Sequence, residues 1–283
     1  MEKFMPENEK YPLVSVVMAV YNNMDEKVLE SAIASVMQQD YENLELLICD
    51  DGSSNNTLQQ INRIKKQYTK IRVFHYEQNH GAAYARNLCI KKAKGQYIAI
   101  MDADDISVKN RFTKQVTYLQ QHRDIGFVGS RAQFFEKRIG DDNEIYRYCQ
   151  KPEGKDFLLN LPFVHASCMF RREVLGMVKG YSVRKNRIRV EDYDMLLRIY
   201  ESGYRGANLP DVLYYIRRDL AQYRRRKYRY RFYEAQMKFE AFRKLGLMPE
   251  GIIYALKPLV IGLVPPRILD SLRQIYYNRK SKA

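Results

Sequence analysis

Apolar runs alternate with amphipathic segments along the N-terminal part of the chain. Residues 12–20, PLVSVVMAV, form a continuous β-branched run that is typical of a buried parallel strand, and 44–50 and 71–76 have the same character. Between these runs apolar residues recur at helical spacing, as at Leu29 and Ile33. The pattern therefore predicts strands that are joined by helices.

A fourth strand is predicted at 97–102, YIAIMD, after a helix that begins near Ala82 and ends with Gly95 as its C-cap. Four strands joined by helices predict an α/β fold with an open, Rossmann-like parallel sheet. In such sheets ligands bind at the carboxyl ends of the strands. Three polar clusters fall there: Tyr21-Asn22, Asp50-Asp51-Gly52-Ser53 and Asp102 to Asp105.

The alternation changes beyond residue 125. Shorter strands are predicted at 127–135 and 165–172, and a helix over 190–203 carries two acids in its first turn. From about Gln222 the pattern is helical, basic and Tyr-rich, and then apolar. We therefore predict one domain over 1–217 and a helical C-terminal region over 218–283.

Charge and cysteine content narrow the class of protein. The 283 residues carry a net charge of +15, and the segment 217–231 holds eight arginines and lysines against one acid, which favours an anionic surface as partner. The alternative is a solvated helix face. The four cysteines show no CxxC spacing, so we expect reduced core residues rather than a zinc or disulfide framework.

The N-terminus lacks an apolar segment behind a basic start, and no uncharged apolar run is long enough to span a bilayer. We therefore expect a cytoplasmic protein. The tail GIIYALKPLVIGLVPP, residues 251–266, suits an interfacial helix at the inner side of the cell membrane. The alternative is a helix that covers an apolar flank of the preceding domain.

Three carboxylates, Asp102, Asp104 and Asp105, follow the fourth strand. Like charges at this spacing repel one another, so the cluster favours a bound cation. The alternative is a set of solvated turn acids. A dinucleotide-dependent oxidoreductase is excluded, because no GxGxxG follows the first strand.

The motifs VSVVMAVYNN, CDDGSSNNT, NHGAAYARNLCIKKAKGQYIAIMDADD and VEDYDMLLR occur in an order and spacing that resemble the family 2 glycosyltransferases, inverting enzymes of the GT-A fold. The resemblance covers roughly residues 12–216 and is nearest to bacterial enzymes of capsule, exopolysaccharide or O-antigen synthesis. It implies a mixed, mainly parallel sheet with helices on both faces, followed by a C-terminal helical extension.

The resemblance implies a nucleotide-sugar donor, most simply a UDP-sugar, and a divalent ion. Asp104 would ligate Mn²⁺ or Mg²⁺, and Asp102 would face the metal or the ribose. A hard ion held by carboxylates suits a leaving diphosphate. Asp105 would shape the loop or the sugar pocket.

Further donor-binding positions follow from the same resemblance. Asp50 and Asp51 correspond to nucleobase readers, since a carboxylate accepts a hydrogen bond from an imide N–H. Tyr21 would pack on the base or only cover the sheet. Arg86 would complete the pocket or form a plain ion pair between helices. The predicted donor-binding set is Ala19, Tyr21, Asp50, Asp51, Arg86, Asp102, Ala103 and Asp104.

The resemblance places the catalytic base at Asp192, next to Glu191. A carboxylate in hydrogen-bond reach can take the proton of the acceptor hydroxyl. The alternative makes both acids N-terminal partners of the helix dipole. The implied acceptor is a saccharide or a polyprenyl-diphosphate-linked saccharide.

At two positions the sequence does not decide whether a further residue ligates the metal. His165 is either near the acceptor or metal, or a hydrogen-bonded structural histidine. Where many relatives carry a histidine after the last core strand, this chain has arginines and Asp219, which puts a third metal ligand in doubt. The alternative function, an Arg/Tyr-rich module that binds single-stranded nucleic acid, conflicts with the carboxylate-lined edge, so we expect no nucleic acid as partner.

Overall fold

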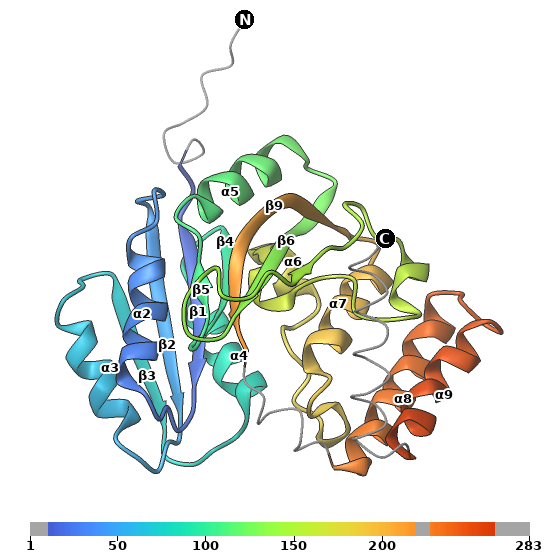
Figure 1. Ribbon diagram of the computed structural model, residues 1–283. Coiled ribbons are helices and arrows are strands. Elements are labelled where there is room, and N and C mark those ends of the chain that lie inside the picture. Colours follow the sequence, from blue (N-terminus) through green and yellow to red (C-terminus); the bar gives the residue numbers. More distant parts are fainter. Residues whose placement is uncertain (1–10, 219–226, 264–283) are drawn as a thin grey trace, which may run out of the picture.

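The computed structural model describes residues 11–218 and 227–263, which form an α/β fold around one sheet (Figure 1). Within these residues nine strands pair in the order β3-β2-β1-β4-β8-β6-β9-β5, with β7 on β6. The predicted mixed, mainly parallel sheet is confirmed. The strands are β1 (Val14–Val20), β2 (Leu44–Asp51), β3 (Ile71–Tyr76), β4 (Tyr97–Asp102), β5 (Ile106–Ser107), β6 (Ile125–Phe135), β7 (Ile145–Tyr146), β8 (Met169–Arg171) and β9 (Arg205–Arg217).

The strands β3, β2, β1 and β4 are parallel and lie where the apolar runs predict them. Every residue of β2 is buried, because helices cover both faces of the sheet. The register pairs Ala19 of β1 with Asp102 of β4. It also pairs Val20 of β1 with Asp50 of β2. The polar residues at the carboxyl ends of three strands therefore meet at one edge.

Helices lie on both faces of the sheet, as predicted. One apolar core lies under α2, α3 and α5, and a second lies under α4, α6 and α7. The helices are α2 (Glu26–Met37), α3 (Thr57–Lys65), α4 (Ala82–Lys92), α5 (Arg111–Gln121), α6 (Arg172–Met177), α7 (Glu191–Glu201), α8 (Tyr228–Lys244) and α9 (Gly251–Leu263), with short 3₁₀ turns η1 (Gly154–Phe157), η2 (His165–Ser167) and η3 (Lys185–Arg187).

One predicted helix end is wrong. The helix α4 ends at Lys92, with Ala93 as an extended C-cap, so Gly95 is not the cap. A Cβ on Gly95 would lie 2.5 Å from the carbonyl oxygen of Leu13 and 2.8 Å from Ser15 Oγ. Glycine is needed there because the backbone passes close to the start of β1.

The expectation that the cysteines are core residues is correct for three of the four. Cys49, Cys89 and Cys168 are buried, whereas Cys149 is exposed, and all four are free thiols. Cys149 follows the polar stretch YRY rather than an apolar run. Its sequence context therefore matches its position on the surface.

The helices α8 and α9 lie side by side next to α7 (Figure 1). Met237 and Phe242 of α8 and Ala255 of α9 belong to the same apolar core as α7. Lys244 of α8 also forms a 3.1 Å ion pair with Glu201 of α7. The described part of the C-terminal region therefore covers an apolar flank of the preceding domain, and the boundary near 218 stays a prediction.

The opposite side of α9 is apolar and exposed. Ile253 is 75% exposed and Val260 is 64% exposed. None of the helices in the two described ranges is long and apolar enough to cross a membrane. Part of the basic segment, residues 219–226, and the end of the tail, 264–283, lie outside the described residues.

Candidate active site

The loop after β4 carries the three predicted carboxylates and is held by the end of β9. The backbone N–H of Asp102 donates to Tyr214 Oη at 3.1 Å, and the same hydroxyl bonds to the Asp105 carboxyl. The backbone N–H of Arg217 donates to Asp105 Oδ1 at 2.8 Å, and Arg217 Nε donates to the carbonyl oxygen of Asp104 at 3.0 Å. Asp105 therefore fixes the shape of this loop.

Asp105 differs from its two neighbours in burial, since it is only 4% exposed whereas Asp102 and Asp104 are half-buried. Burial raises the pKa of Asp105 well above its ordinary value, and the charges of Asp104 and Asp102 raise it further. Asp102 and Asp104 are therefore the carboxylates of this loop that a ligand can reach.

Arg86 of α4 lies beside Asp102. Its Nη2 donates to Asp102 Oδ1 at 2.7 Å, and its guanidinium carbon lies 5.7 Å from the centre of the Tyr181 ring. Arg86 Nε is buried and has no hydrogen-bond partner among the described residues. A buried donor without a partner is costly, and a ligand that binds beside Asp102 can satisfy it.

The two acids at the start of α7 lie near the same group of residues. The charges of Asp192 and Asp102 both act on His165 and on Tyr181, and the charge of Glu191 acts on Arg86. Burial raises the pKa of Asp192, with Glu191 raising it further, whereas His165 and Arg86 oppose the rise.

Glu191 and Asp192 use their oxygens differently. Glu191 Oε2 is buried and has no hydrogen-bond partner among the described residues. Asp192 Oδ1 accepts a 2.8 Å hydrogen bond from the backbone N–H of Tyr193, and the helix cap residue Val190 provides no side-chain bond. The two acids therefore do not form a closed capping arrangement with the helix.

His165 is 8% exposed and lies near Arg86 and Asp192. Its Nε2 is hydrogen-bonded to the Tyr181 hydroxyl at 2.8 Å. Burial and the neighbouring Arg86 cation lower the pKa of His165 to about 4, against the opposing charges of Asp192 and Asp102. The imidazole is therefore neutral near pH 7 and positioned by a hydrogen bond, as the structural interpretation predicts.

The predicted nucleobase readers lie at the expected edge, but their carboxylates are enclosed. Asp50 has no exposed surface, because Ser53 Oγ bonds its Oδ1 and His75 Nδ1 lies 2.9 Å from its Oδ2. A nucleotide can contact Asp50 only after Ser53 or His75 moves. The role of Asp50 as a nucleobase reader stays a prediction.

Asp51 holds the turn that precedes α4. Its oxygens accept from the backbone N–H groups of His80 and Gly81, at 3.0 and 2.7 Å, and from Asn79 Nδ2 at 2.9 Å. Burial raises the pKa of Asp51, and the two N–H bonds oppose the rise. Gly52, in the turn after β2, permits close contact with this segment, because its φ is +70° and a Cβ would lie 2.3 Å from the carbonyl carbon of Gln78.

The remaining predicted donor positions line the same edge. Tyr21 follows β1 and is 51% exposed, so its ring is available to a ligand. Ala19 is next to Asp102 across the β1–β4 pair, and Ala103 is half-buried within the carboxylate loop. Asp219 lies outside the described residues.

Asp194 of α7 has a structural role. It is 6% exposed, and its two oxygens accept from Arg187 Nε and Arg198 Nε, each at 2.7 Å. With both oxygens bound to guanidinium groups, this carboxylate is not available as a base.

The donor set fits a divalent ion that is shared with a substrate. The described residues contain no group of three or more His, Cys, Asp or Glu side chains placed to hold a metal. Mg²⁺ commonly binds one or two carboxylates together with substrate phosphates and water. Asp104 and Asp102 provide such a pair, and the unpartnered Arg86 Nε beside them is suited to an anionic ligand.

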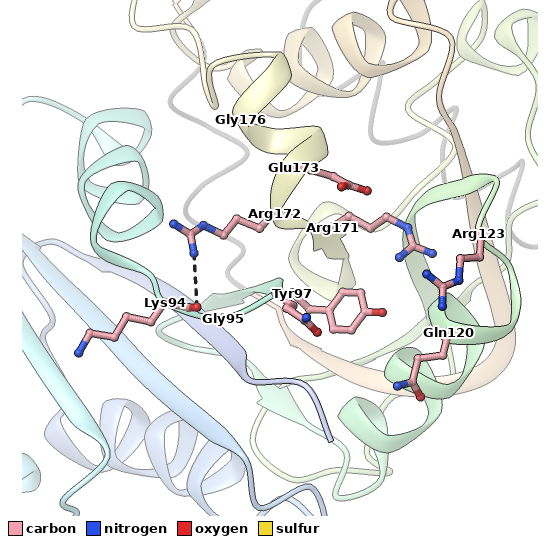
Figure 2. Close-up of a pocket in the computed structure, with 10 residues that line it drawn as sticks. Lys94, Gly95, Tyr97, Gln120, Arg123, Arg171, Arg172, Glu173 and Gly176 are labelled. Carbon is pink, nitrogen blue, oxygen red and sulfur yellow. Dashed lines mark hydrogen bonds between the residues drawn. The ribbon is translucent and has the colours of Figure 1, made fainter. Parts of the chain in front are cut away.

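Two cavities lie near or away from these acids, and neither contains Asp102 or Asp104. A cavity of about 310 Å³ is bounded by the start of α7 and by α8 and α9, and Asp192 forms part of its wall. A larger cavity of about 600 Å³ is lined by residues around Tyr97, at the end of β4 opposite Asp102. Figure 2 shows Arg172 donating to the Lys94 carbonyl there, and Arg171 likewise donates to main-chain carbonyls. Because it lies at the opposite end of β4 from Asp102, the larger cavity is remote from the candidate site.

Sequence patterns did not identify Tyr181, Tyr214 and Arg217 as members of the site. Each reaches Arg86 or the carboxylate loop from a distant segment, and Tyr214 is paired with the loop across 112 residues. The stretch YYIRRDLAQ contains the last two, but no local spacing assigns them a contact. The pairing of β9 with β5 brings Tyr214 and Arg217 to the carboxylate loop.

Comparisons with known proteins identify the family of the chain. Residues 15–177 match the family described as "Glycosyl transferase family 2". The chain is 36% identical to EpsE of Bacillus subtilis, a glycosyltransferase by its name, over 92% of both chains. It is 31% identical to the Escherichia coli UDP-Glc:alpha-D-GlcNAc-diphosphoundecaprenol beta-1,3-glucosyltransferase WfaP, over 71% of this chain and 76% of that one.

Solved structures share the fold. The mannosyltransferase PcManGT from Pyrobaculum calidifontis, in complex with GDP-Man and Mn²⁺, superposes with a TM-score of 0.62 at 19% identity. The match covers 94% of this chain and 80% of that one. At this identity the likeness shows the architecture alone.

Proposed function

The chain belongs to glycosyl transferase family 2, and from that premise we propose that it transfers a sugar from a nucleotide-sugar, with inversion, to a saccharide or lipid-linked saccharide of bacterial surface polysaccharide synthesis. The observation that carries the proposal is that two sets of acids lie around Arg86 and His165. Asp102 and Asp104 lie at the end of β4, and Asp192 lies at the start of α7. We propose no role in nucleic-acid binding.

The donor is proposed to be a UDP-sugar whose diphosphate lies against Asp102 and Asp104. WfaP takes UDP-Glc by its name, and PcManGT was solved with GDP-Man. When bound by Asp104 and Asp102, Mn²⁺ or Mg²⁺ would stabilise the charge that develops on the leaving diphosphate. Arg86 holds Asp102 in position through their ion pair, and its buried Nε has no hydrogen-bond partner among the described residues.

Asp192 is proposed to take the proton of the acceptor hydroxyl. A base must be ionised and within hydrogen-bond reach of that hydroxyl. The raised pKa of Asp192 increases its basicity relative to an exposed aspartate. Glu191, with one oxygen unpartnered, is proposed to orient the acceptor.

The donor site can be tested by calorimetry with UDP. The diphosphate and Asp104 are both anionic, so we expect binding in Mn²⁺ and at least a tenfold loss of affinity in EDTA. Equal affinity in Mn²⁺ and in EDTA would rule out the metal role.

We also propose that the enzyme acts at the inner surface of the cell membrane, with α9 as the contact. Burying one large apolar side chain is worth ~1.5–3 kcal/mol, so changing both Ile253 and Val260 to Ser should reduce binding to phosphatidylglycerol vesicles by at least about tenfold. Both side chains are exposed, and therefore the fold should be unaffected. Unchanged vesicle flotation would argue against α9 as the contact.

A further inference from the structure

A small, positively charged cavity lies between the start of α7 and the helices α8 and α9. We name it the α8–α9 cavity; its volume is about 310 Å³, and its charged lining residues are Arg189, Asp192, Arg231, Glu234, Lys238 and Lys257. Four cations thus share a space with two carboxylates. The volume is at the lower end of the range for small-molecule sites.

Within residues 11–218 and 227–263, few acids balance the cations of this cavity. Glu234 is shared between Arg231 Nη1, at 3.4 Å, and Lys238 Nζ, at 3.5 Å. Arg189 and Lys257 form no ion pair with any residue of 11–218 or 227–263. The cavity therefore holds more positive charge than its own acids balance.

Lys238 is the most deeply buried of these cations. Its side chain is 3% exposed and lies 5.1 Å from the centre of the Tyr193 ring. Burial lowers the pKa of Lys238, and the nearby charges of Lys257 and Arg231 lower it further, against the opposing effect of Glu234. A bound anion would offset the cost of keeping these cations together.

The location of the cavity relates this charge to the reaction. Asp192 lines the cavity, and its charge also acts on His165 and Tyr181, so the cavity extends to the proposed base. An anion held by Lys257 and Arg231 would lie within one small cavity of the acceptor hydroxyl. The sugar that carries the acceptor hydroxyl must then be separated from the phosphate of the same acceptor molecule by only a short distance.

The outer surface of the same helices is apolar. Ile253, Leu256 and Val260 of α9 are all exposed. The same helix α9 carries Lys257, which lines the cavity together with Asp192. Apolar side chains, cations and the proposed base therefore occur in one region, as a lipid tail, a phosphate group and a sugar occur in one amphiphile.

On the basis of the proposed function, we propose that the α8–α9 cavity binds the phosphate or diphosphate that joins a short acceptor saccharide to its carrier lipid. Membrane phospholipid headgroups offer the same phosphate chemistry. The connection of the cavity to Asp192 favours the acceptor over a headgroup.

The test uses the full-length protein and farnesyl diphosphate as probe, in EDTA so that the metal-dependent donor site does not take up the diphosphate. Lys257→Gln and Arg231→Gln should each weaken binding by about tenfold or more, because each removes a charge-assisted contact. Lys257→Arg, which keeps the charge, should stay within about threefold of wild type. The matched control is Arg243→Gln, which removes one exposed charge of α8 outside the cavity and should change the affinity by less than about threefold.

Three results would overturn the proposal. They are unchanged affinity in both cavity variants, an equal loss in Arg243→Gln, or farnesyl diphosphate binding no tighter than farnesol. A headgroup source would instead make Lys257→Gln weaken binding to phosphatidylglycerol vesicles more than Arg243→Gln does. Binding of UDP by the wild-type protein in Mn²⁺ tests the proposed function separately, because its absence would refute that function whatever the probe shows.

Discussion

Replacement of Asp192 by Asn is the most informative single change, because it removes a charge and keeps the shape of the side chain. Among residues 11–218 and 227–263, the only hydrogen bond assigned to the Asp192 carboxylate comes from the backbone N–H of Tyr193, and an Asn Oδ1 can accept it equally well. Folding should therefore survive the change.

The structure sets opposite expectations for rate and stability. A positioned base contributes about 10²- to 10⁴-fold to a proton transfer, so kcat should fall by at least about 10²-fold, which is roughly 3 kcal/mol of activation free energy. Because the pKa of Asp192 is raised in the folded state, its ionised form is destabilising above that pKa. At pH 7 the free energy of unfolding should be unchanged or slightly higher in Asp192→Asn.

The assay is initial-rate transfer at saturating donor and acceptor, together with UDP affinity and a pH profile. In the wild type the base must be ionised, so activity should fall as the pH drops through the pKa of Asp192, which lies above its ordinary value of 3.8. The residual activity of Asp192→Asn should lack this acidic limb, and its UDP affinity should be intact.

The contrasting variant is Asp194→Asn, two residues further along α7. It leaves Arg187 and Arg198 without their shared carboxylate, and breaking a buried pair in this way costs about 3–5 kcal/mol of stability. The reasoning would be refuted if kcat of Asp192→Asn were within a factor of a few of wild type. Glu191→Gln should reduce kcat less than Asp192→Asn.

Two further changes test the surroundings of the site. Arg86→Lys keeps the charge but not the planar guanidinium group that reaches Asp102, so UDP affinity in Mn²⁺ should fall by about tenfold. Unchanged affinity by calorimetry would refute the role of Arg86 in the donor site. His165 has a folded pKa of about 4 against an ordinary value of 6.5, so the unfolded chain takes up a proton at a higher pH than the folded chain does. Relative to His165→Gln, the wild type should therefore lose about 2–3 kcal/mol of unfolding free energy between about pH 7.5 and about pH 4.5. Urea unfolding at the two pH values measures this difference, and parallel curves for the two proteins would contradict it.

The sequence predicts the first half of the fold well because its signals are local. Continuous β-branched runs become fully buried strands, and the polar residues after them lie together because parallel strands end at one edge. The prediction that Gly95 caps a helix failed because glycine is favoured both at helix C-caps and where two backbone segments pass close together. A glycine after a helical pattern indicates a C-cap, but here it permits close contact with the backbone of Leu13 and Ser15.

The site was predicted less completely, because some of its residues are far apart in the sequence and others are buried by neighbouring side chains. The grouping of Arg86 with Asp102 follows from motifs close in sequence, whereas Tyr214 reaches the same loop only through the fold. Burial of Asp50 by Ser53 and His75 depends on side-chain packing that no spacing reveals. The α8–α9 cavity likewise combines segments that are distant in sequence, although the charge that lines it is visible in the composition.

The central claim is that this chain transfers a sugar from a nucleotide-sugar with the help of a divalent ion. The most direct test is release of nucleoside diphosphate by the purified protein from a panel of UDP-, GDP- and dTDP-sugars, with Mn²⁺ or with EDTA, in the presence of a lipid-diphosphate-linked saccharide. We predict release from a UDP-sugar in Mn²⁺, and loss of that release both in EDTA and in Asp104→Asn. Release that is equal in EDTA, or that survives in Asp104→Asn at the wild-type rate, would contradict the claim.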